Sequence, residues 1–154
     1  MTWTIALLAV GLALQPAAAA PPASSADAAA VRKVLGDYKA AIERLDARGT
    51  ERLFTADSAV FETGGSEGRY ADYLSHHLAP ELKAFRSFRF TNYKVDVRFV
   101  GSAALATETY GYRIETDKGE AHERLGVATS VLRKEKGRWK IVMMHNSSRK
   151  PRGS

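Results

Sequence analysis

The chain has 154 residues, a formal net charge of +6, 45% hydrophobic residues and no cysteine. This length suits one domain of ordinary globular composition, which can bury enough surface to need no disulfide or structural metal. The absence of cysteine excludes disulfide frameworks, thiol nucleophiles, cysteine-ligated zinc and a lipid anchor on an N-terminal cysteine.

The start of the chain has the pattern of an export signal. No ionisable side chain precedes Asp27, and the apolar run Ile5–Leu14 is too short to span a bilayer as a helix. Four alanines at 17–20 supply the small residues that a signal peptidase requires. We therefore predict a signal peptide over 1–20 and a short disordered leader over 21–26. The mature protein is expected to be periplasmic or secreted, with no membrane association after signal removal.

The excess positive charge lies in the last part of the chain, from Arg124 onward, where Glu135 is the one acidic residue. These basic residues flank a predicted turn or lie in a basic tail over 149–154. They are not interleaved with aromatic residues, as a nucleic-acid surface would require. Such charges are typical of solvated surface, so no nucleic-acid partner is predicted.

The first predicted element is an amphipathic helix. Either Ser24 or Ser25 can cap its start, and Gly49 can end it. A short second helix over 50–54 follows. Apolar residues spaced by three and four place one stripe on the first helix, formed by Val31, Leu35, Tyr38, Ile42 and Leu45.

The next segment mixes short elements. We expect a brief strand over 59–62 and a flexible loop over Gly64–Gly68. A third helix should follow, ended or kinked near Leu78 by Pro80. Its inward face is predicted to carry Tyr70, Tyr73, Leu74, His77 and Leu78.

From residue 88 the apolar period changes to two, which predicts four long strands, at 88–99, 103–116, 120–134 and 139–148. The parity slips near Thr91-Asn92, which indicates a β-bulge. Gly111 and Gly126 would relieve crowding in a strongly curved sheet. The expected fold is an α+β cone in which helices pack on the concave face of a strongly bent antiparallel sheet. The sheet would form the floor of a pocket, and the first and third helices its lid.

This order of elements, together with the segments 38–46, 52–61 and 137–142, resembles the nuclear transport factor 2-like superfamily and its SnoaL-like group. The resemblance covers roughly residues 26–148, which implies one such domain over 27–148. The superfamily holds isomerases, dehydratases, transport adaptors and kinase-association domains. The resemblance therefore implies a cone-shaped fold with a pocket, without naming a reaction.

The resemblance also implies candidate catalytic residues. In the ketosteroid isomerase branch, a tyrosine on the first helix donates a hydrogen bond to an oxyanion, and Tyr38 lies at that place. A carboxylate just after the first strand transfers the proton there, and Glu62 matches it. A carboxylate in an apolar cone would have a raised pKa, as a general base needs. The sequence departs from that branch at Thr129, which stands near the position of its second acid.

Histidines are the second group of candidates. His77 shares the inward stripe of the third helix, and His76 lies at its margin. On the last strand, His145 is a further catalytic candidate, because strand alternation predicts that His145 and Ser147 face the pocket. Two histidines and Glu62 could bind a metal, but no ligand spacing supports this, so neither metal nor cofactor is predicted. The same alternation adds three apolar residues to the pocket: Trp139, Ile141 and Met143.

Three functions remain open from the sequence. The first is an exported protein with an amphipathic pocket for a small organic ligand. The second is an acid/base enzyme of the isomerase or dehydratase type that uses Glu62 or His145. The third is a dimeric assembly module with a vestigial pocket. A homodimer through the sheet is expected in each case, because strand alternation points an apolar set outward: Ala128, Leu132, Val142 and Met144.

Overall fold

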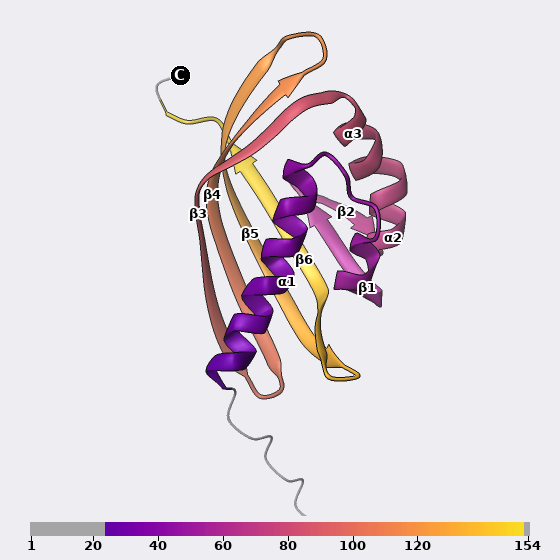
Figure 1. Cartoon of the computed structure of the whole chain (residues 1–154), viewed down its shortest axis with the longest axis vertical. Helices are drawn as coiled ribbons and strands as arrows, with labels where there is room; N and C mark the ends of the chain where they lie inside the picture. The colour runs from indigo at the N-terminus through magenta and orange to yellow at the C-terminus, as the bar shows by residue number, and fades with distance from the viewer. Residues whose placement is uncertain (1–23, 153–154) are drawn as a thin grey trace, which may run out of the picture.

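The computed structural model describes residues 24–152, so the predicted signal peptide and most of the predicted leader lie outside the described residues. A helical part and a sheet form the fold (Figure 1). The helical segments are α1 (Ser25–Glu43), the 3₁₀ turn η1 (Thr50–Leu53), α2 (Tyr70–Tyr73), the π-helical turn η2 (Leu74–Leu78) and α3 (Ala79–Lys83).

Helix α1 begins at a capping box. The Asp27 backbone N–H donates to the Ser24 hydroxyl oxygen at 3.2 Å, and the Asp27 carboxylate accepts from the Ser24 backbone N–H at 3.4 Å. This reciprocal pair satisfies two backbone donors that the helix itself leaves free. The predicted apolar stripe is confirmed, since Val31, Leu35 and Ile42 are all buried.

A β-hairpin occupies the segment that was expected to be a flexible loop. Strand β1 (Phe54–Glu62) is longer than predicted and pairs with β2 (Gly65–Gly68). The two turn residues, Thr63 and Gly64, have φ of 44° and 86°. Positive φ at both positions is the geometry of a type I′ turn, which matches the twist of paired strands.

The third predicted helix does not end at Leu78. It runs from α2 through η2 into α3, with one widened turn in which the Ala79 backbone N–H donates to the Leu74 carbonyl, five residues earlier. Pro80 lies in the first turn of α3. The widened turn directly before Pro80 interrupts the regular hydrogen-bond ladder, and such a widened turn accommodates the missing N–H and the ring of a proline within a continuous helix.

The sheet is mixed rather than antiparallel throughout. Its spatial order is β2-β1-β6-β5-β4-β3, and the β1–β6 pair is parallel, whereas all other pairs are antiparallel. The predicted bulge in β3 is confirmed by a register shift between Thr91 and Lys94. The long strands are β3 (Phe85–Val100), β4 (Ala103–Thr116), β5 (Ala121–Glu135) and β6 (Arg138–Arg149).

The two strand glycines lie where neighbouring atoms leave no room for a side chain, as predicted. A Cβ on Gly126 would lie 2.1 Å from a ring carbon of Tyr110, and one on Gly111 would lie 2.5 Å from the Thr91 hydroxyl oxygen. Both distances are far below contact distance. The curved sheet therefore depends on glycine at these positions.

The hydrophobic core lies between the helices and the concave face of the sheet, with α1 packed against β3 and β6 (Figure 1). Each fully buried aliphatic or aromatic side chain contributes about 1.5–3 kcal/mol to folding. The largest fully buried apolar side chains of this core are those of Tyr70, Leu35, Leu132, Ile141, Val31 and Val60.

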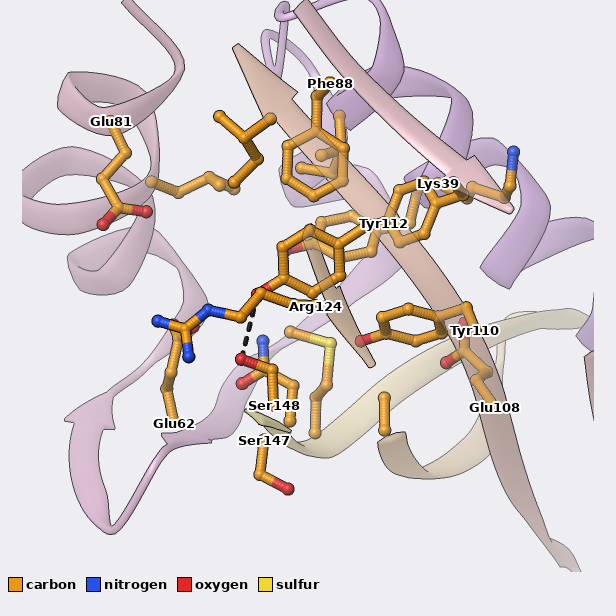
Figure 2. Close-up of a pocket in the computed structure, with 18 of the residues that line it drawn as sticks. Lys39, Glu62, Glu81, Phe88, Glu108, Tyr110, Tyr112, Arg124, Ser147 and Ser148 are labelled. Carbon is orange, nitrogen blue, oxygen red and sulfur yellow. Dashed lines mark hydrogen bonds between the residues drawn. The ribbon is translucent and has the colours of Figure 1, made fainter. Parts of the chain in front are cut away.

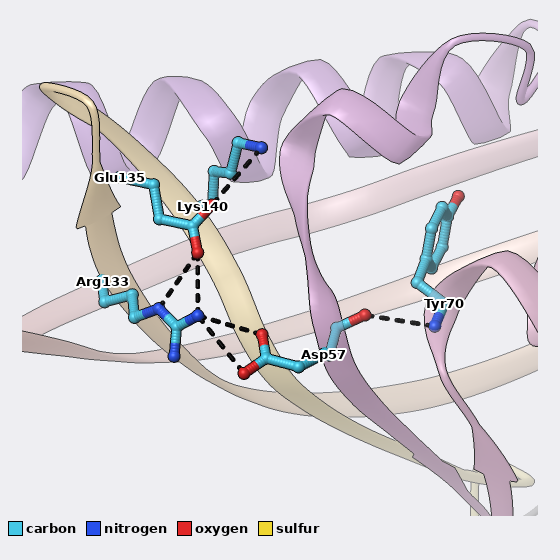
Figure 3. A network of polar contacts seen from close by, with 6 residues as sticks. Asp57, Tyr70, Arg133, Glu135 and Lys140 are labelled. Atoms are coloured by element: carbon cyan, nitrogen blue, oxygen red, sulfur yellow. Dashed lines mark hydrogen bonds and ion pairs between the residues drawn. The ribbon is translucent and has the colours of Figure 1, made fainter.

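Polar contacts tie β1 to its neighbours outside this core (Figure 3). Arg133 on β5 reaches across β6 to Asp57 on β1, with 3.0 Å between guanidinium nitrogen and carboxylate oxygen, and also pairs with Glu135 at 2.8 Å. These groups are largely exposed, so the pairs contribute little to stability. The buried Tyr70 backbone N–H donates to the Ser58 hydroxyl, which joins the start of α2 to β1.

A second bulge, not predicted, reverses the alternation of β6. Leu132 on β5 pairs with Ile141 and Val131 pairs with Met143, so Val142 is an extra residue in β6. Such a residue moves every later side chain to the opposite face. Met144 is consequently buried rather than outward.

The outward apolar set predicted for a dimer is wrong in most of its members: the bulge turns Met144 inward, and on β5 Leu132 pairs with the buried Ile141 and shares its inward face. Ala128, Leu132 and Met144 are buried, and Val142 is partly buried. The exposed large apolar residues of β5 and β6 are instead Leu125, Val127 and Met143. No helix among residues 24–152 has the length and apolar character needed to cross a membrane.

Candidate functional site

A cavity of about 420 Å³ opens on the concave side of the cone, between α1, the η2–α3 segment and the sheet (Figure 2). Its walls differ in chemistry. Carboxylate and imidazole groups from the end of β1, from η2 and from α3 form one wall. Aromatic side chains of β3 and β4 form the other. A cavity of this size accommodates a small organic molecule.

The polar wall centres on Glu62, the last residue of β1. Its carboxylate accepts a hydrogen bond from the Tyr73 hydroxyl at 2.8 Å. The Nε2 atom of His77 lies 3.5 Å from the Glu62 carboxylate and 3.4 Å from that of Glu81. The Tyr73 and His77 rings are stacked, with centroids 5.2 Å apart. Tyr73 and His77 thus hold Glu62 at the cavity surface.

The electrostatics of this wall follow from burial and from neighbouring charge. Burial, followed by the negative charge of Glu62, raises the pKa of the Tyr73 phenol far above its ordinary value, so the hydroxyl remains a donor. Burial also raises the pKa of Glu81, and His77 opposes that shift. The Tyr73 phenol therefore stays protonated and remains a hydrogen-bond donor to the Glu62 carboxylate.

The aromatic wall is built from alternate residues of β3 and β4. Phe88 and Tyr112 are stacked with ring centroids 5.2 Å apart, and Phe90 meets Tyr110 edge-on at 5.0 Å. The Tyr112 hydroxyl donates to the Ser148 hydroxyl oxygen at 2.9 Å, which joins this wall to β6. The rings present a flat apolar surface that suits a planar or cyclic ligand.

A buried acid, Glu108, also lines the cavity, beside Tyr110 (Figure 2). Glu108 on β4 accepts a hydrogen bond from the Tyr93 hydroxyl. Burial raises the pKa of Glu108, and the hydrogen bond from Tyr93 only partly offsets it. Lys39 on α1 lies nearby, with its ammonium 5.2 Å from the centre of the Phe90 ring. The ammonium also pairs with Glu43 at 2.7 Å.

Arg124 on β5 brings a positive charge to the same cavity. Figure 2 shows its guanidinium on the side of the cavity where Glu62 lies. Within the described part of the chain, residues 24–152, no hydrogen bond or ion pair engages this guanidinium. It is therefore available to an anionic or carbonyl oxygen of a ligand.

Four of the predicted pocket residues border the cavity: Tyr38, Glu62, His77 and Ser147. Ser147 follows the bulge and is exposed, and Figure 2 shows its hydroxyl turned away from the other labelled side chains, so the prediction that this side chain faces the pocket is wrong. The Tyr38 ring packs edge-on against Tyr70, with centroids 5.9 Å apart. Burial raises the pKa of the Tyr38 phenol well above its ordinary value. Whether Tyr38 or Glu62 takes part in a reaction stays a prediction.

The other predicted pocket residues lie elsewhere. His145 and Met143 are exposed on the outer face, because the extra residue Val142 reverses the alternation on which both placements rested. Trp139 and Ile141 precede the bulge and are buried in the hydrophobic core.

His76 is exposed and does not line the cavity. It lies beside Glu67, and Glu67 does line the cavity. The Nε2 atom of His76 is 3.4 Å from the Glu67 backbone carbonyl.

Sequence reasoning missed several residues of the cavity. The segment Tyr110-Gly111-Tyr112 carried a usable signal, since two tyrosines of one strand parity flank a glycine in a curved sheet. Glu108 has the same parity, so it too could have been placed inward. Nothing local pointed to Glu81 or Arg124, because a charged side chain on a helix or strand is normally solvated.

A bent sheet with helices on its concave face and one two-walled cavity defines a protein of the nuclear transport factor 2-like fold class. The family model of the SnoaL-like domain matches residues 31–150, which is most of the chain. The chain therefore belongs to the SnoaL-like family, and the resemblance and the cone-shaped fold expected from the sequence are confirmed. No curated protein matches it in sequence.

Solved structures of low sequence identity share this fold. A candidate dehydratase of the nuclear transport factor 2-like family from Streptomyces avermitilis aligns with a TM-score of 0.71 at 20% identity, covering 83% of this chain and 100% of that one. A candidate ketosteroid isomerase from Shewanella frigidimarina aligns with a TM-score of 0.67 at 24% identity, covering 77% of this chain and 94% of that one. A protein of the nuclear transport factor 2-like superfamily from Salmonella enterica aligns with a TM-score of 0.70 at 18% identity, covering 80% of this chain and 91% of that one.

Proposed function

We propose that this protein binds a small, cyclic, amphipathic organic molecule in the cavity of its cone. The observation that carries the proposal is the presence of two chemically unlike sets of side chains around one cavity. Stacked rings such as Phe88 and Tyr112 line the same cavity as the Glu62–His77 pair. A packed core would not keep carboxylates, an imidazole and a free guanidinium around an open volume, because unpaired buried polar groups cost about 1–3 kcal/mol each.

The same geometry favours an acid/base reaction as a second candidate function. Glu62 is held by the Tyr73 hydroxyl at the cavity surface, where it can take a proton from a carbon next to a carbonyl group and return it. Arg124 would stabilise the negative charge that forms on the carbonyl oxygen. The names of two structural neighbours, a candidate ketosteroid isomerase and a candidate dehydratase, are compatible with this chemistry.

Export of the protein remains part of the proposal. The signal pattern over 1–20 supports action in the periplasm or outside the cell, on a ligand present there. The capping residue of the first helix, Ser24, lies within the predicted leader 21–26, so the last residues of that leader are helical rather than disordered. A chain processed shortly before Ser24 would keep every described contact of α1.

A bicyclic ketone, 2-tetralone, tests both candidate functions in one set of measurements. We expect saturable binding to the wild-type protein by calorimetry. In D₂O we expect accelerated exchange of the ketone's α-hydrogens, followed by NMR. Glu62→Gln should retain binding within about threefold, while exchange falls by about 10²-fold or more, because the general base is lost. His145→Gln, on the outer face, serves as the matched control and should change neither quantity.

The outcomes separate the two functions. Absence of saturable binding would contradict the ligand-binding proposal for this class of molecule. Binding without exchange, or exchange that Glu62→Gln leaves unchanged, would leave the protein as a binding protein and remove the enzymatic candidate.

A further inference from the structure

Two histidines and a glutamate meet at the rim of the cavity. Glu67, His76 and His77 each offer one potential ligand atom, and these atoms lie within 4.8 Å of one another. Glu67 comes from β2 and the histidines from η2, so the hairpin and the turn after it bring the three together. Ligand atoms bound tetrahedrally to one ion at bond lengths of about 2.0–2.2 Å lie about 3.3–3.6 Å from one another, so the three groups must approach by about 1 Å or more to share an ion. Side-chain rotation of these partly exposed residues can close that gap.

The π-helical turn explains how neighbouring histidines can serve one site. Consecutive residues of an α-helix point about 100° apart. In η2 the hydrogen bond from the Ala79 N–H to the Leu74 carbonyl spans five residues, which widens the turn. The rings of His76 and His77 lie nearly perpendicular, with centroids 6.4 Å apart. Such widened turns occur frequently at functional sites.

Both imidazoles also have the outer partners that metal-binding histidines use. A histidine that binds a metal through one ring nitrogen usually donates the other N–H to a carbonyl or a carboxylate. The Nε2 atom of His76 is 3.4 Å from the Glu67 backbone carbonyl. The Nε2 atom of His77 lies 3.5 Å from Glu62 and 3.4 Å from Glu81. These partners orient the rings and add negative charge around the site.

We propose that Glu67, His76 and His77 bind a divalent transition-metal ion of the zinc type. Two neutral imidazoles with a carboxylate form the mixed nitrogen and oxygen set that such ions prefer over calcium or magnesium. Two of the three residues, Glu67 and His77, also line the cavity. The remaining coordination positions therefore face the cavity, where an oxygen atom of a bound ligand can occupy one of them.

This position would also give the ion a chemical role. A metal ion beside Glu62 would polarise a ligand carbonyl and ease removal of the neighbouring proton. That role depends on the function proposed above, whereas binding of the ion does not.

Titration of the metal-free protein with ZnCl₂ by calorimetry, and with CoCl₂ by visible absorption, tests the site in the absence of any organic ligand. We expect one ion per chain and the absorption bands of cobalt bound to nitrogen and oxygen. Glu67→Gln and His76→Gln should each weaken binding by at least about tenfold. Both residues lie at the surface or near it, so thermal melting should show that the variants remain folded.

An exposed histidine with a nearby carboxylate, outside the cavity, provides the matched control. His122 lies 3.6 Å from Glu120, and His122→Gln should leave the affinity for zinc unchanged. Absence of saturable binding, equal affinity in all three variants, or loss of binding in His122→Gln alone would each overturn the proposal. The metal titration contains no 2-tetralone, so absence of zinc binding would not contradict the ligand-binding proposal. Absence of 2-tetralone binding would likewise not contradict the metal site.

Discussion

At the scale of single residues, the cavity differs from a packed core by the acids it keeps. Glu62 is held by a tyrosine and a histidine, and Glu81 approaches that same histidine. Glu108 has the Tyr93 hydroxyl as its hydrogen-bond partner and is only 7% exposed. When a carboxylic acid buried in this way ionises, the free energy of unfolding falls, so the stability of the protein depends on pH.

The variant Glu108→Gln tests that cost. Burial raises the pKa of Glu108 above the ordinary value of 4.5. Below pH 4.5 the acid is protonated in both the folded and the unfolded state and costs nothing. As the pH rises through 4.5 the unfolded state loses its proton first, so stability falls until the raised pKa is passed. Glutamine keeps the acceptor for Tyr93 without the charge. Its free energy of unfolding should exceed that of the wild type by about 1 kcal/mol at pH 7.5.

Urea denaturation at two pH values measures this effect. The advantage of Glu108→Gln should shrink toward zero at pH 4, where the wild-type acid is protonated. A difference between the two proteins that is the same at both pH values would contradict an ionisation cost and indicate a packing effect.

At the scale of elements, the concave face depends on strand residues that have no side chain. Gly126 on β5 lies against the Tyr110 ring of β4, and that ring is part of the aromatic wall. The shape of the cavity is therefore coupled to one backbone position on the neighbouring strand.

The variant Gly126→Ala should both destabilise the fold and disturb the cavity. A methyl group 2.1 Å from a ring carbon forces the Tyr110 ring to move, which costs about 1–3 kcal/mol of unfolding free energy. Binding of 2-tetralone should weaken with it, because the displaced ring belongs to the aromatic wall. Thermal or urea unfolding together with calorimetry measures both effects.

Gly36 in the middle of α1 provides the control, since a Cβ there would meet no atom within 4 Å. Gly36→Ala should stabilise the protein by about 0.5–1 kcal/mol, because alanine loses less conformational entropy in a helix. It should leave binding unchanged. Destabilisation of equal size by both variants would show that the contact with Tyr110 is not the cause.

At the scale of the whole molecule, the outer face of the sheet remains the predicted dimer interface, with corrected residues. Leu125, Val127 and Met143 are 41%, 46% and 37% exposed. Leu125 and Val127 lie on β5 and Met143 lies on β6. The two strands are neighbours in the sheet, where Val127 pairs with Ser147 and Val131 pairs with Met143. Apolar residues gathered on an exposed sheet face are typical of a protein–protein contact.

Light scattering at micromolar concentration tests the assembly. We expect a homodimer for the wild type and a monomer for Val127→Glu, because a carboxylate buried in an apolar interface would be unpaired. Val100→Glu, at a position that is 63% exposed at the end of β3, is the control and should remain dimeric. A monomeric wild-type protein would contradict the prediction.

Much of the fold could be read from local periodicity. The stripe of α1, the strand alternation of β3 to β5 and the bulge near Asn92 each leave a visible pattern of apolar and polar residues. The inward positions of Tyr38, Glu62 and His77 followed from that pattern and from the resemblance to the family.

Only the tertiary structure decided the face of His145 and the meeting of His76 with Glu67. The bulge in β3 shows in the sequence because apolar residues change parity there, whereas Met143 and Met144 are alike, so the shift at Val142 leaves no trace. A bulge is set by pairing with the neighbouring strand, and one extra residue turns all later side chains to the other face. The chain determines its own periodicity, but the register between distant segments is settled only when they pack together.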